Sequence, residues 1–478
     1  MKIKTALIVL MSSLTQTVEF PITNNPTNDQ KLEAHFQKLK QDPTALRSFF
    51  WQMPKGGDIH HHFIGSVYAE DYIEMALKDG LWIDPVSYQL YFDQTDALAK
   101  NAKHALPLCQ LLAEDPTERD HVIDHWSVRN HKENSRDGHH WFFATFQKFL
   151  PAAAGNEVAL LSELCRAAAA ENVQYLETMV EIPSILERVA KIAEGAVWES
   201  DESPDTQLQD LYSYFEKEDI DQWAGYNAEV MEHWHKTTDK HGIQLKFQTP
   251  AFRIFPNLAT VFAHLMLAFK TADLAENVIG VNFVAPEDHQ VSLANYRAHM
   301  AMIRFLKVKF PNVNISLHAG ELVAYKGDAR EQDLTYHIDE ALTVAGAQRI
   351  GHGVDIQSET RKDQVLTLMK SKGIAVEINL GSNQVILEST PEDHPLSTYL
   401  AAGVPVCLSS DDAGILRSDL THQYELLVKY MPDISYAQVK ELVLNNIEYS
   451  FLNTLEKARE IEKLTEAFDN FELRVLTK

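Results

Sequence analysis

Eight short, mostly apolar segments recur along this chain of 478 residues, and helical patterns fill most of the intervals between them. Strands that alternate with helices form a parallel sheet, and eight such strands can close into a barrel. The sequence therefore predicts an α/β protein with a TIM (β/α)8 barrel, whose functional groups gather where the strands end. The eight predicted strands are residues 57–63, 173–178, 243–248, 278–284, 313–318, 348–352, 374–379 and 404–409.

Two segments add to what a simple barrel needs. Residues 21–52 precede the first predicted strand and contain helical spacing, which predicts an N-terminal helical extension. Residues 69–150 are mostly helical in pattern, rich in aromatic residues and too long for a strand-to-helix loop. We expect them to form a helical insertion over the mouth of a barrel that spans residues 53–478.

Side chains that bind metals follow several of the predicted strands. His60 and His62 alternate along the first strand, so both imidazoles point to the same side. His318 ends the fifth strand, and Asp411 follows the eighth. Three imidazoles and one carboxylate suit one metal ion with room for a water molecule, and zinc fits this donor set best.

Further polar residues at the same strand ends suit proton transfer. His352 ends the sixth strand and is a natural base for water bound to a metal. Glu321 lies three residues after His318 and could donate a proton to a substrate, while Asp412 could accept a hydrogen bond from a bound ring. The whole set suits hydrolysis at an electron-poor carbon whose leaving group needs a proton.

Each of these residues alone has an ordinary structural explanation. A single histidine is more often a core or surface residue, and two adjacent aspartates often cap a helix. Their occurrence together at separate strand ends favours a functional site. Arg253 and the turn at residues 381–383 carry no such support, and we expect both to be structural.

The charge and composition of the chain restrict its possible binding partners and its cellular compartment. The chain has 43 basic and 68 acidic residues, and no basic cluster could follow a phosphate backbone, which argues against a nucleic acid polymer as partner. Residues 1–20 combine two lysines with a short apolar run, which predicts a signal peptide and a secreted or periplasmic protein. The alternative is a cytoplasmic protein with a frayed N-terminus. No other segment resembles a membrane span.

Cysteine usage adds little to this picture. Cys109, Cys165 and Cys407 are too few for a disulfide framework. Cys109 and Cys165 could form one bridge in an oxidising compartment, whereas Cys407 falls in a predicted barrel strand and is expected in the core.

Four motifs occur in the order that characterises the adenosine deaminase family. They are residues 53–62, 318–321, 351–353 and 410–412, which read MPKGGDIHHH, HAGE, GHG and SDD. The chain resembles that family over most of its length. With its signal-like N-terminus and long insertion, it is most similar to the secreted, growth-factor-related branch.

The resemblance implies a role for each motif residue. One zinc ion would be bound by His60, His62, His318 and Asp411. Glu321 would protonate N1 of the purine, and His352 would orient and deprotonate the attacking water. Asp412 would receive a hydrogen bond from the N7 side of the substrate, a small purine nucleoside. Water would replace the amino group at C6, so that adenosine gives inosine and ammonia.

Two positions depart from the common pattern of the family. Many members have an aspartate, associated with the ribose 5′-hydroxyl, where this chain has Ile64. A glycine backbone amide commonly approaches the purine where this chain has Ala285. Deamination should survive both changes. Our hypothesis is that Ile64 relaxes selection for a free 5′-hydroxyl and admits 5′-modified nucleosides or 2′-deoxyadenosine.

Two rival functions remain at this point. Other metal-dependent amidohydrolases of the same barrel type act on esters, lactones or amides, but dinuclear members commonly have a lysine at the end of strand four, and residues 281–285 contain none. A secreted binding protein without catalytic activity is the second rival, and the presence of Glu321 and His352 argues against it. AMP is a weaker candidate substrate, because no arginine and lysine cluster follows the strands. The sequence does not decide whether the chain forms a homodimer through its N-terminal helices.

Overall fold

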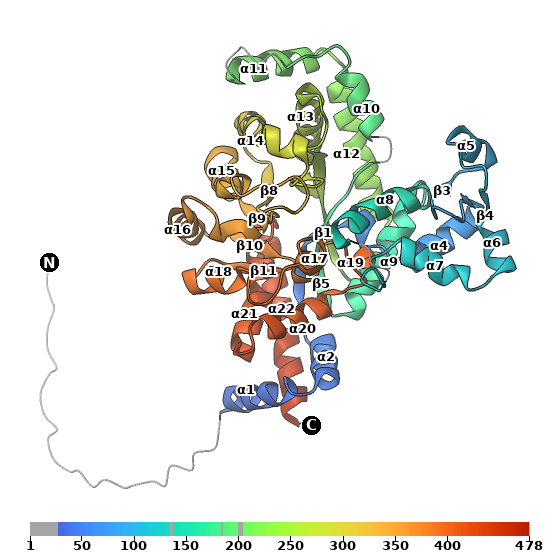
Figure 1. The fold of residues 1–478 in the computed structure, drawn as a ribbon. Coiled ribbons are helices and arrows are strands. Elements are labelled where there is room, and N and C mark those ends of the chain that lie inside the picture. Colours follow the sequence, from blue (N-terminus) through green and yellow to red (C-terminus); the bar gives the residue numbers. More distant parts are fainter. Residues whose placement is uncertain (1–26, 134–136, 183–184, 199–203, 478) are drawn as a thin grey trace, which may run out of the picture.

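Eight parallel strands form the centre of the molecule (Figure 1). The computed structural model describes residues 27–133, 137–182, 185–198 and 204–477. The strands are hydrogen-bonded in the order β1-β5-β6-β7-β8-β9-β10-β11, and helices surround them, so the predicted TIM barrel is confirmed. Their bounds are β1 (Gly56–His62), β5 (Val173–Met179), β6 (Gln244–Phe252), β7 (Val278–Val284), β8 (Asn314–Ala319), β9 (Arg349–His352), β10 (Ala375–Ile378) and β11 (Val406–Leu408).

The barrel closes between β1 and the residues that follow β11. His61 and Asp411 form a parallel bridge. The backbone N–H of His62 donates to the carbonyl of Asp411 at 3.1 Å, and the N–H of Asp411 donates to the carbonyl of His60 at 3.0 Å. This closure places the histidines of the first strand beside the aspartate that follows the last strand.

The register of β8 and β9 fixes two further site residues. His318 lies opposite Gly351, and Ala319 lies opposite His352. A Cβ atom on Gly351 would lie 2.6 Å from Cε1 of His60, so a side chain at this position would displace the His60 ring. Glycine on β9 therefore makes room for a histidine of β1.

Helices cover the outside of the barrel, as expected for parallel strands that are buried on both faces. Helix α13 is buried around most of its circumference, because it packs between α12, α14 and the strands β6 and β7. The other helices leave a polar face in solvent. The main outer helices are α9 (Glu157–Ala170), α12 (Ile220–Thr237), α13 (Leu258–Leu274), α14 (Gln290–Lys309), α16 (Lys362–Lys372), α18 (Leu396–Ala402) and α21 (Tyr436–Glu448).

Two N-terminal helices pack against the C-terminal part of the chain at one end of the molecule (Figure 1). These helices are α1 (Asn28–Leu39) and α2 (Pro43–Gln52), and their partners are α20 (Leu420–Tyr430) and α22 (Thr454–Thr477). Phe49 lies edge-on to Phe471 with ring centroids 5.1 Å apart. Burial of such aromatic rings explains why the extension folds back onto the barrel.

The insertion between β1 and β5 is mainly helical, as predicted, but it also contains three strands of two residues each. These strands pair antiparallel in the order β3-β2-β4. Two residues are too few to show the period-two pattern of a strand, so the sequence gives no sign of them. The elements are α3 (Phe63–Ser66), α4 (Ala69–Lys78), β2 (Trp82–Ile83), β3 (Leu90–Tyr91), α5 (Gln94–Ala99), β4 (Leu106–Pro107), α6 (Leu108–Glu114), α7 (Glu118–His125) and α8 (Gly138–Ala153).

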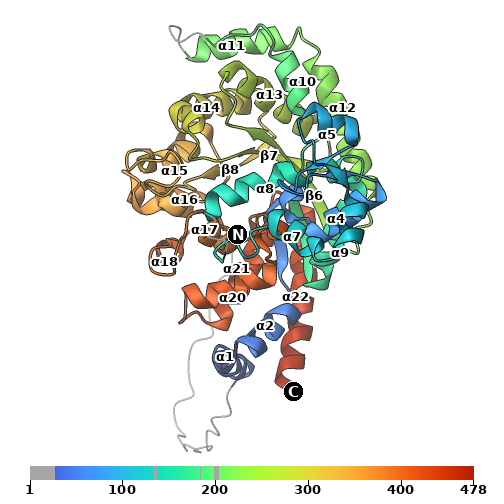
Figure 2. The same cartoon turned by 45° about the vertical axis from the view of Figure 1, so that its right-hand side comes forward.

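Helix α8 is the part of the insertion that approaches the barrel mouth. It packs against α3, α17 (Leu380–Ile386) and α19 (Ala413–Leu416), which follow strands β1, β10 and β11. Figure 2 shows α8 lying across the strands. On the side of the insertion, Phe149 of α8 stacks on Tyr72 with ring centroids 4.5 Å apart.

The sequence led to expectations about a signal peptide, membrane spans and a disulfide bridge. The predicted signal peptide, residues 1–20, lies outside the described residues. None of the described helices combines the length and the apolar character that a membrane span requires. Cys109, Cys165 and Cys407 are all free thiols, so Cys109 and Cys165 do not form the bridge considered above.

Candidate metal and catalytic site

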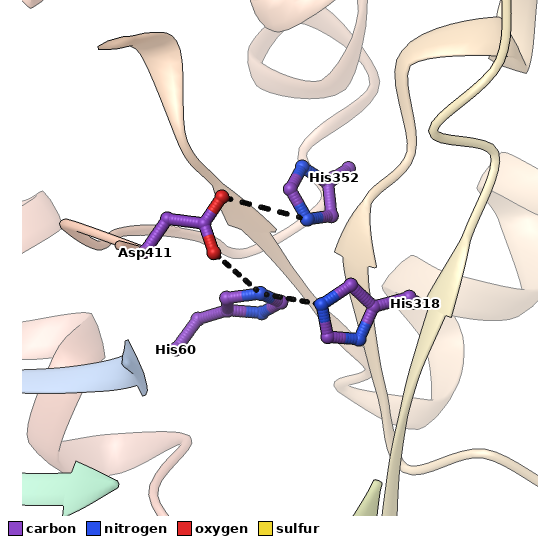
Figure 3. Close-up of side chains that lie close together, drawn as sticks. All are labelled: His60, His318, His352 and Asp411. Carbon is purple, nitrogen blue, oxygen red and sulfur yellow. Dashed lines mark hydrogen bonds and ion pairs between the residues drawn. The ribbon is translucent and has the colours of Figure 1, made fainter. Parts of the chain in front are cut away.

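Ring nitrogens and a carboxylate oxygen converge where β1, β8 and β11 end. His318 Nε2 lies 3.1 Å from His60 Nε2 and 3.1 Å from His62 Nε2. Asp411 Oδ1 lies 3.3 Å from His62 Nε2 and 3.6 Å from His60 Nε2. Figure 3 shows His60, His318 and Asp411 turned toward one another, with His352 beside them.

These separations fit a single bound metal ion. Four ligands about 2.1 Å from a zinc ion in tetrahedral arrangement lie roughly 3.4 Å from one another. The four observed separations lie on both sides of that value. Among the described residues that line the adjoining cavity, none is a lysine or an arginine whose charge would oppose a cation. The donor set is therefore suited to zinc.

Two residues behind the imidazoles orient them, and the sequence analysis did not identify either one. The Nδ1–H of His60 donates to Glu377 Oε2 at 2.6 Å, and that of His318 donates to Asn282 Oδ1 at 2.9 Å. These bonds leave both Nε2 atoms free to face the centre, as in metal sites generally. The available signal was a buried polar residue within an apolar strand, Glu377 in β10 and Asn282 in β7.

Burial and charge set the protonation of the imidazoles. Burial, followed by the nearby charge of His60, holds the pKa of His62 and of His318 well below the usual range. Both rings are therefore neutral, the form that binds a metal. Burial also disfavours a charged His60, but the hydrogen bond and charge of Glu377 outweigh it and raise the pKa of His60. A metal at His60 Nε2 would displace a proton.

Glu321 enters the site from the loop after β8. Glu287 holds this loop, because its carboxylate accepts the backbone N–H of Gly320 at 3.1 Å and that of Glu321 at 2.9 Å. Burial, with the charges of Asp411 and Glu287, raises the pKa of Glu321 well above its usual range. The raised pKa favours the protonated form of Glu321, in which the carboxyl group can act as a general acid.

His352 lies between the proposed acid and the proposed metal ligands. Its Nδ1 is 3.5 Å from Glu321 Oε1, and its Nε2 is 3.9 Å from Asp411 Oδ2. Burial, followed by the charges of His60 and His62, holds the pKa of His352 well below its usual range. The ring is neutral and can accept a proton.

The segment expected to be a structural turn lies against His352. Residues 381–383 belong to helix α17, and Asn383 Nδ2 approaches His352 Nδ1 at 3.1 Å. The position of Asn383 soon after strand β10 was the available signal, because the other site residues also lie at the ends of strands or shortly after them. Arg253, in contrast, is buried and donates to the backbone carbonyl of His318 at 2.8 Å, consistent with the structural role expected for it.

Asp412 is buried beside Asp411 and lines the cavity. Burial, with the charge of Asp411, raises the pKa of Asp412 well above its usual range. Its Oδ1 has no hydrogen-bond partner among the described residues. A Cβ atom on Gly65 would lie 1.5 Å from this Oδ1, so only glycine at position 65 leaves room for the carboxyl group.

A cavity of about 440 Å³ extends from these residues toward helix α8. Its volume is in the range of small-molecule sites. Ile64 and Ala285 both line it, and Ala285 has a φ of 80°, a conformation that favours glycine. The inner end is formed by His62, His318, Glu321, His352, Asp411 and Asp412, and the outer part mainly by Phe142, Phe143, Phe146, Leu150, Leu186, Phe252 and Ile254.

One family model and several curated proteins match parts of this chain. The sequence model described as Adenosine deaminase matches residues 224–467, which is more than half of the chain. An adenosine deaminase from Aedes albopictus is 33% identical over 196 residues, which cover 40% of this chain and 34% of that protein. For the curated relatives compared, the matched part covers 34% to 52% of their own length.

Solved structures with the same fold cover nearly the whole chain. The ADAL protein of Arabidopsis, complexed with IMP, has a TM-score of 0.55 at 18% identity and covers 89% of this chain and 99% of its own. An amidohydrolase from Burkholderia ambifaria with bound Zn has a TM-score of 0.53 at 15% identity and covers 90% of this chain and 95% of its own. At these identities the likeness establishes the fold alone.

Proposed function

Since the chain belongs to the adenosine deaminase family, we propose that it catalyses the hydrolytic deamination of an adenine nucleoside, either adenosine or a close derivative. The convergence of His60, His62, His318 and Asp411 beside the buried Glu321 is the observation that carries this proposal. Water replaces the 6-amino group of the purine, and the products are the inosine compound and ammonia.

The four converging residues are the proposed ligands of one zinc ion. When bound, zinc makes water acidic near neutral pH and thus supplies the nucleophile. Glu377 and Asn282 keep the Nε2 atoms of His60 and His318 directed at the metal position. Among the described residues, none is hydrogen-bonded to Nδ1 of His62 in this way, and 20% of the His62 side chain, which lines the cavity, is exposed.

Glu321 and His352 divide the proton transfers. Glu321 donates its proton to N1 of the purine, which makes C6 more electrophilic. His352 accepts the proton of the attacking water, because its ring is neutral and lies 3.9 Å from Asp411 Oδ2. The departing amino group takes up the proton that His352 accepted and leaves as ammonia, while the new C6 hydroxyl gives its proton back to Glu321 and becomes the carbonyl group of the product. The raised pKa of Asp412 favours a protonated carboxyl, which can donate a hydrogen bond to N7 of the purine. N7 carries no hydrogen, so Asp412 would donate this bond and not accept it as the sequence analysis expected.

The cavity favours a nucleoside over a nucleotide. None of its described lining residues is a lysine or an arginine, although a phosphate group is usually bound by such cations. The IMP complex of Arabidopsis ADAL shows that a nucleotide binds in that protein of the same fold. For this chain we therefore propose adenosine, 2′-deoxyadenosine or a 5′-modified nucleoside, and Ile64 in the cavity wall supports tolerance at the 5′ position.

The test is ammonia and inosine formation from adenosine by the purified protein. Chelation should abolish activity and zinc should restore it, while Glu321→Gln should lower kcat by about 10²-fold or more and leave zinc binding intact. Comparable rates on AMP and adenosine would refute the choice of nucleoside. If the zinc-loaded protein deaminates no aminopurine, the two rival functions would again have to be considered. They are a different amidohydrolase activity and a binding protein without catalytic activity.

A further inference from the structure

One acidic residue in the cavity wall has no role in the chemistry proposed above. Glu181 lies two residues beyond β5, and it lines the same cavity as His62, Glu321 and Asp412. Its wall neighbours Met179, Leu186 and Phe252 are apolar. Among the described residues, no donor or acceptor is within hydrogen-bond distance of Glu181 Oε1, although this atom is buried.

A buried carboxyl oxygen without a partner is unfavourable, so the position of Glu181 Oε1 in a cavity indicates that a ligand could supply the partner. Burial alone raises the pKa of Glu181 to about 8. The side chain is therefore mostly uncharged at neutral pH and offers one O–H donor and one carbonyl acceptor. This pair of functions matches an alcohol group, which also donates and accepts.

The position of Glu181 separates it from the part of the cavity that would hold the purine. Glu321, Ala285 and Asp412 follow β8, β7 and β11. Glu181 follows β5, which pairs directly with β1, and Ile64 follows β1. Glu181 and Ile64 therefore lie on neighbouring strand ends, away from the residue that would protonate the ring. We place the sugar of a bound nucleoside on this side, because the residues proposed to contact the purine follow other strands.

We propose that Glu181 is a specificity-determining residue that hydrogen-bonds a hydroxyl group of the sugar. The inference rests on the proposed function. Ile64 cannot accept a hydrogen bond, whereas Glu181 places a carboxyl group in a wall that is mainly apolar apart from Gln147 and the residues of the proposed catalytic site. The substrate class is then an adenine compound with a hydroxylated, unphosphorylated sugar, in preference to free adenine and to nucleotides.

The test compares adenosine with its 2′-deoxy, 3′-deoxy and 5′-deoxy analogues in the zinc-loaded full chain. Glu181→Leu should lower kcat/KM for adenosine by about 10-fold or more, mainly through KM. It should have almost no effect on the one analogue that lacks the hydroxyl bound by Glu181. Glu181→Gln keeps a donor and an acceptor and should stay within about 3-fold of the wild type on all four substrates.

A matched control distinguishes recognition from altered packing. Leu186 lines the same wall without a polar atom, so Leu186→Ala should change kcat/KM for all four substrates by one common factor. If Glu181→Leu does not fold, Glu181→Met replaces it, because methionine has nearly the length of glutamate.

The two proposals fail in different ways. The role of Glu181 would be overturned if Glu181→Leu changed kcat/KM by the same factor for all four substrates, or did not change it at all. Either result would leave the deaminase proposal intact. Absence of ammonia from all four substrates with the wild-type protein would overturn the proposed function itself.

Discussion

Replacing Glu377 by glutamine tests how the metal site is oriented. Glu377 Oε2 accepts from His60 Nδ1 at 2.6 Å, and its Oε1 accepts from Ser316 Oγ at 2.9 Å and from Arg349 Nε at 2.5 Å. In Glu377→Gln, the single amide oxygen can accept either from His60 or from Ser316 and Arg349, but not from both groups. If it stays with Arg349, the amide NH2 faces His60 Nδ1, and the ring must move its proton to Nε2.

The magnitude follows from that change of tautomer. A proton on Nε2 blocks the atom that faces the proposed metal position. Loss of the group that orients a metal-binding histidine typically weakens metal binding by about 10- to 100-fold. This range corresponds to roughly 1.4–2.7 kcal/mol of binding free energy. The alternative flip of the amide would keep the bond to His60 but turn the NH2 group toward two donors, the Nε–H of Arg349 and the hydroxyl of Ser316, so this orientation is disfavoured.

Zinc affinity is measured by competition with a chromophoric chelator, and the unfolding free energy of the metal-free protein is measured separately. Ser316→Ala is the matched control, because it removes a hydrogen bond to Glu377 but leaves the bond to His60. Its zinc affinity should stay within about 3-fold of the wild type. A folded Glu377→Gln protein that binds zinc as tightly as the wild type would refute the reasoning, as would equal losses in both variants.

Three further variants test other parts of the structure. Gly65→Ala should lower kcat/KM by about 10²-fold, because the added Cβ atom displaces Asp412. Gly225→Ala is the control and should leave kcat/KM unchanged, because there is open space around Gly225. Steady-state kinetics measures the activity of both variants, and circular dichroism checks that they fold. Asn383→Ala removes a 3.1 Å contact to His352 and should lower kcat about 10-fold with little change in KM. Burial raises the pKa of Glu359 to about 7, so the folded state binds more protons than the unfolded chain and loses stability as the pH rises from about 5 to 8. Glu359→Gln keeps both backbone hydrogen bonds at Oε1, so in denaturant titrations it should be more stable than wild type by about 1–3 kcal/mol at pH 8 and nearly equal at pH 5.

The barrel strands could be predicted from the sequence because parallel strands buried on both faces appear as apolar runs. The third predicted strand ends at residue 248, whereas β6 continues to Phe252. Its last residues, Thr249 to Phe252, extend the strand through pairing with β7, which is a tertiary contact. The strands β2, β3 and β4 were missed for the opposite reason, because a strand of two residues has no pattern.

The candidate site could be predicted where its residues lie at the end of a strand or shortly after it. His60, His318 and Asp411 needed only the rule that strand ends of a barrel meet at one face. Glu377 was visible as an acid in an apolar strand, but its partner His60 is adjacent only after the barrel closes. Glu181 could not be singled out, since its apolar surroundings are contributed by separate segments of the chain.

Closure of the barrel and assembly of the site depend on the same residues. The bridge between His61 and Asp411 joins the first strand to the end of the last, and His60 and His62 flank that bridge. A metal held by these side chains would add a second link across the same seam, because any ligand bound only by the folded state stabilises it. The backbone of Asp411 has a φ of 61°, which is unfavourable for a residue with a side chain. The two backbone hydrogen bonds of the seam hold Asp411 in that conformation, and so the closing contact also aims its carboxylate at the histidines.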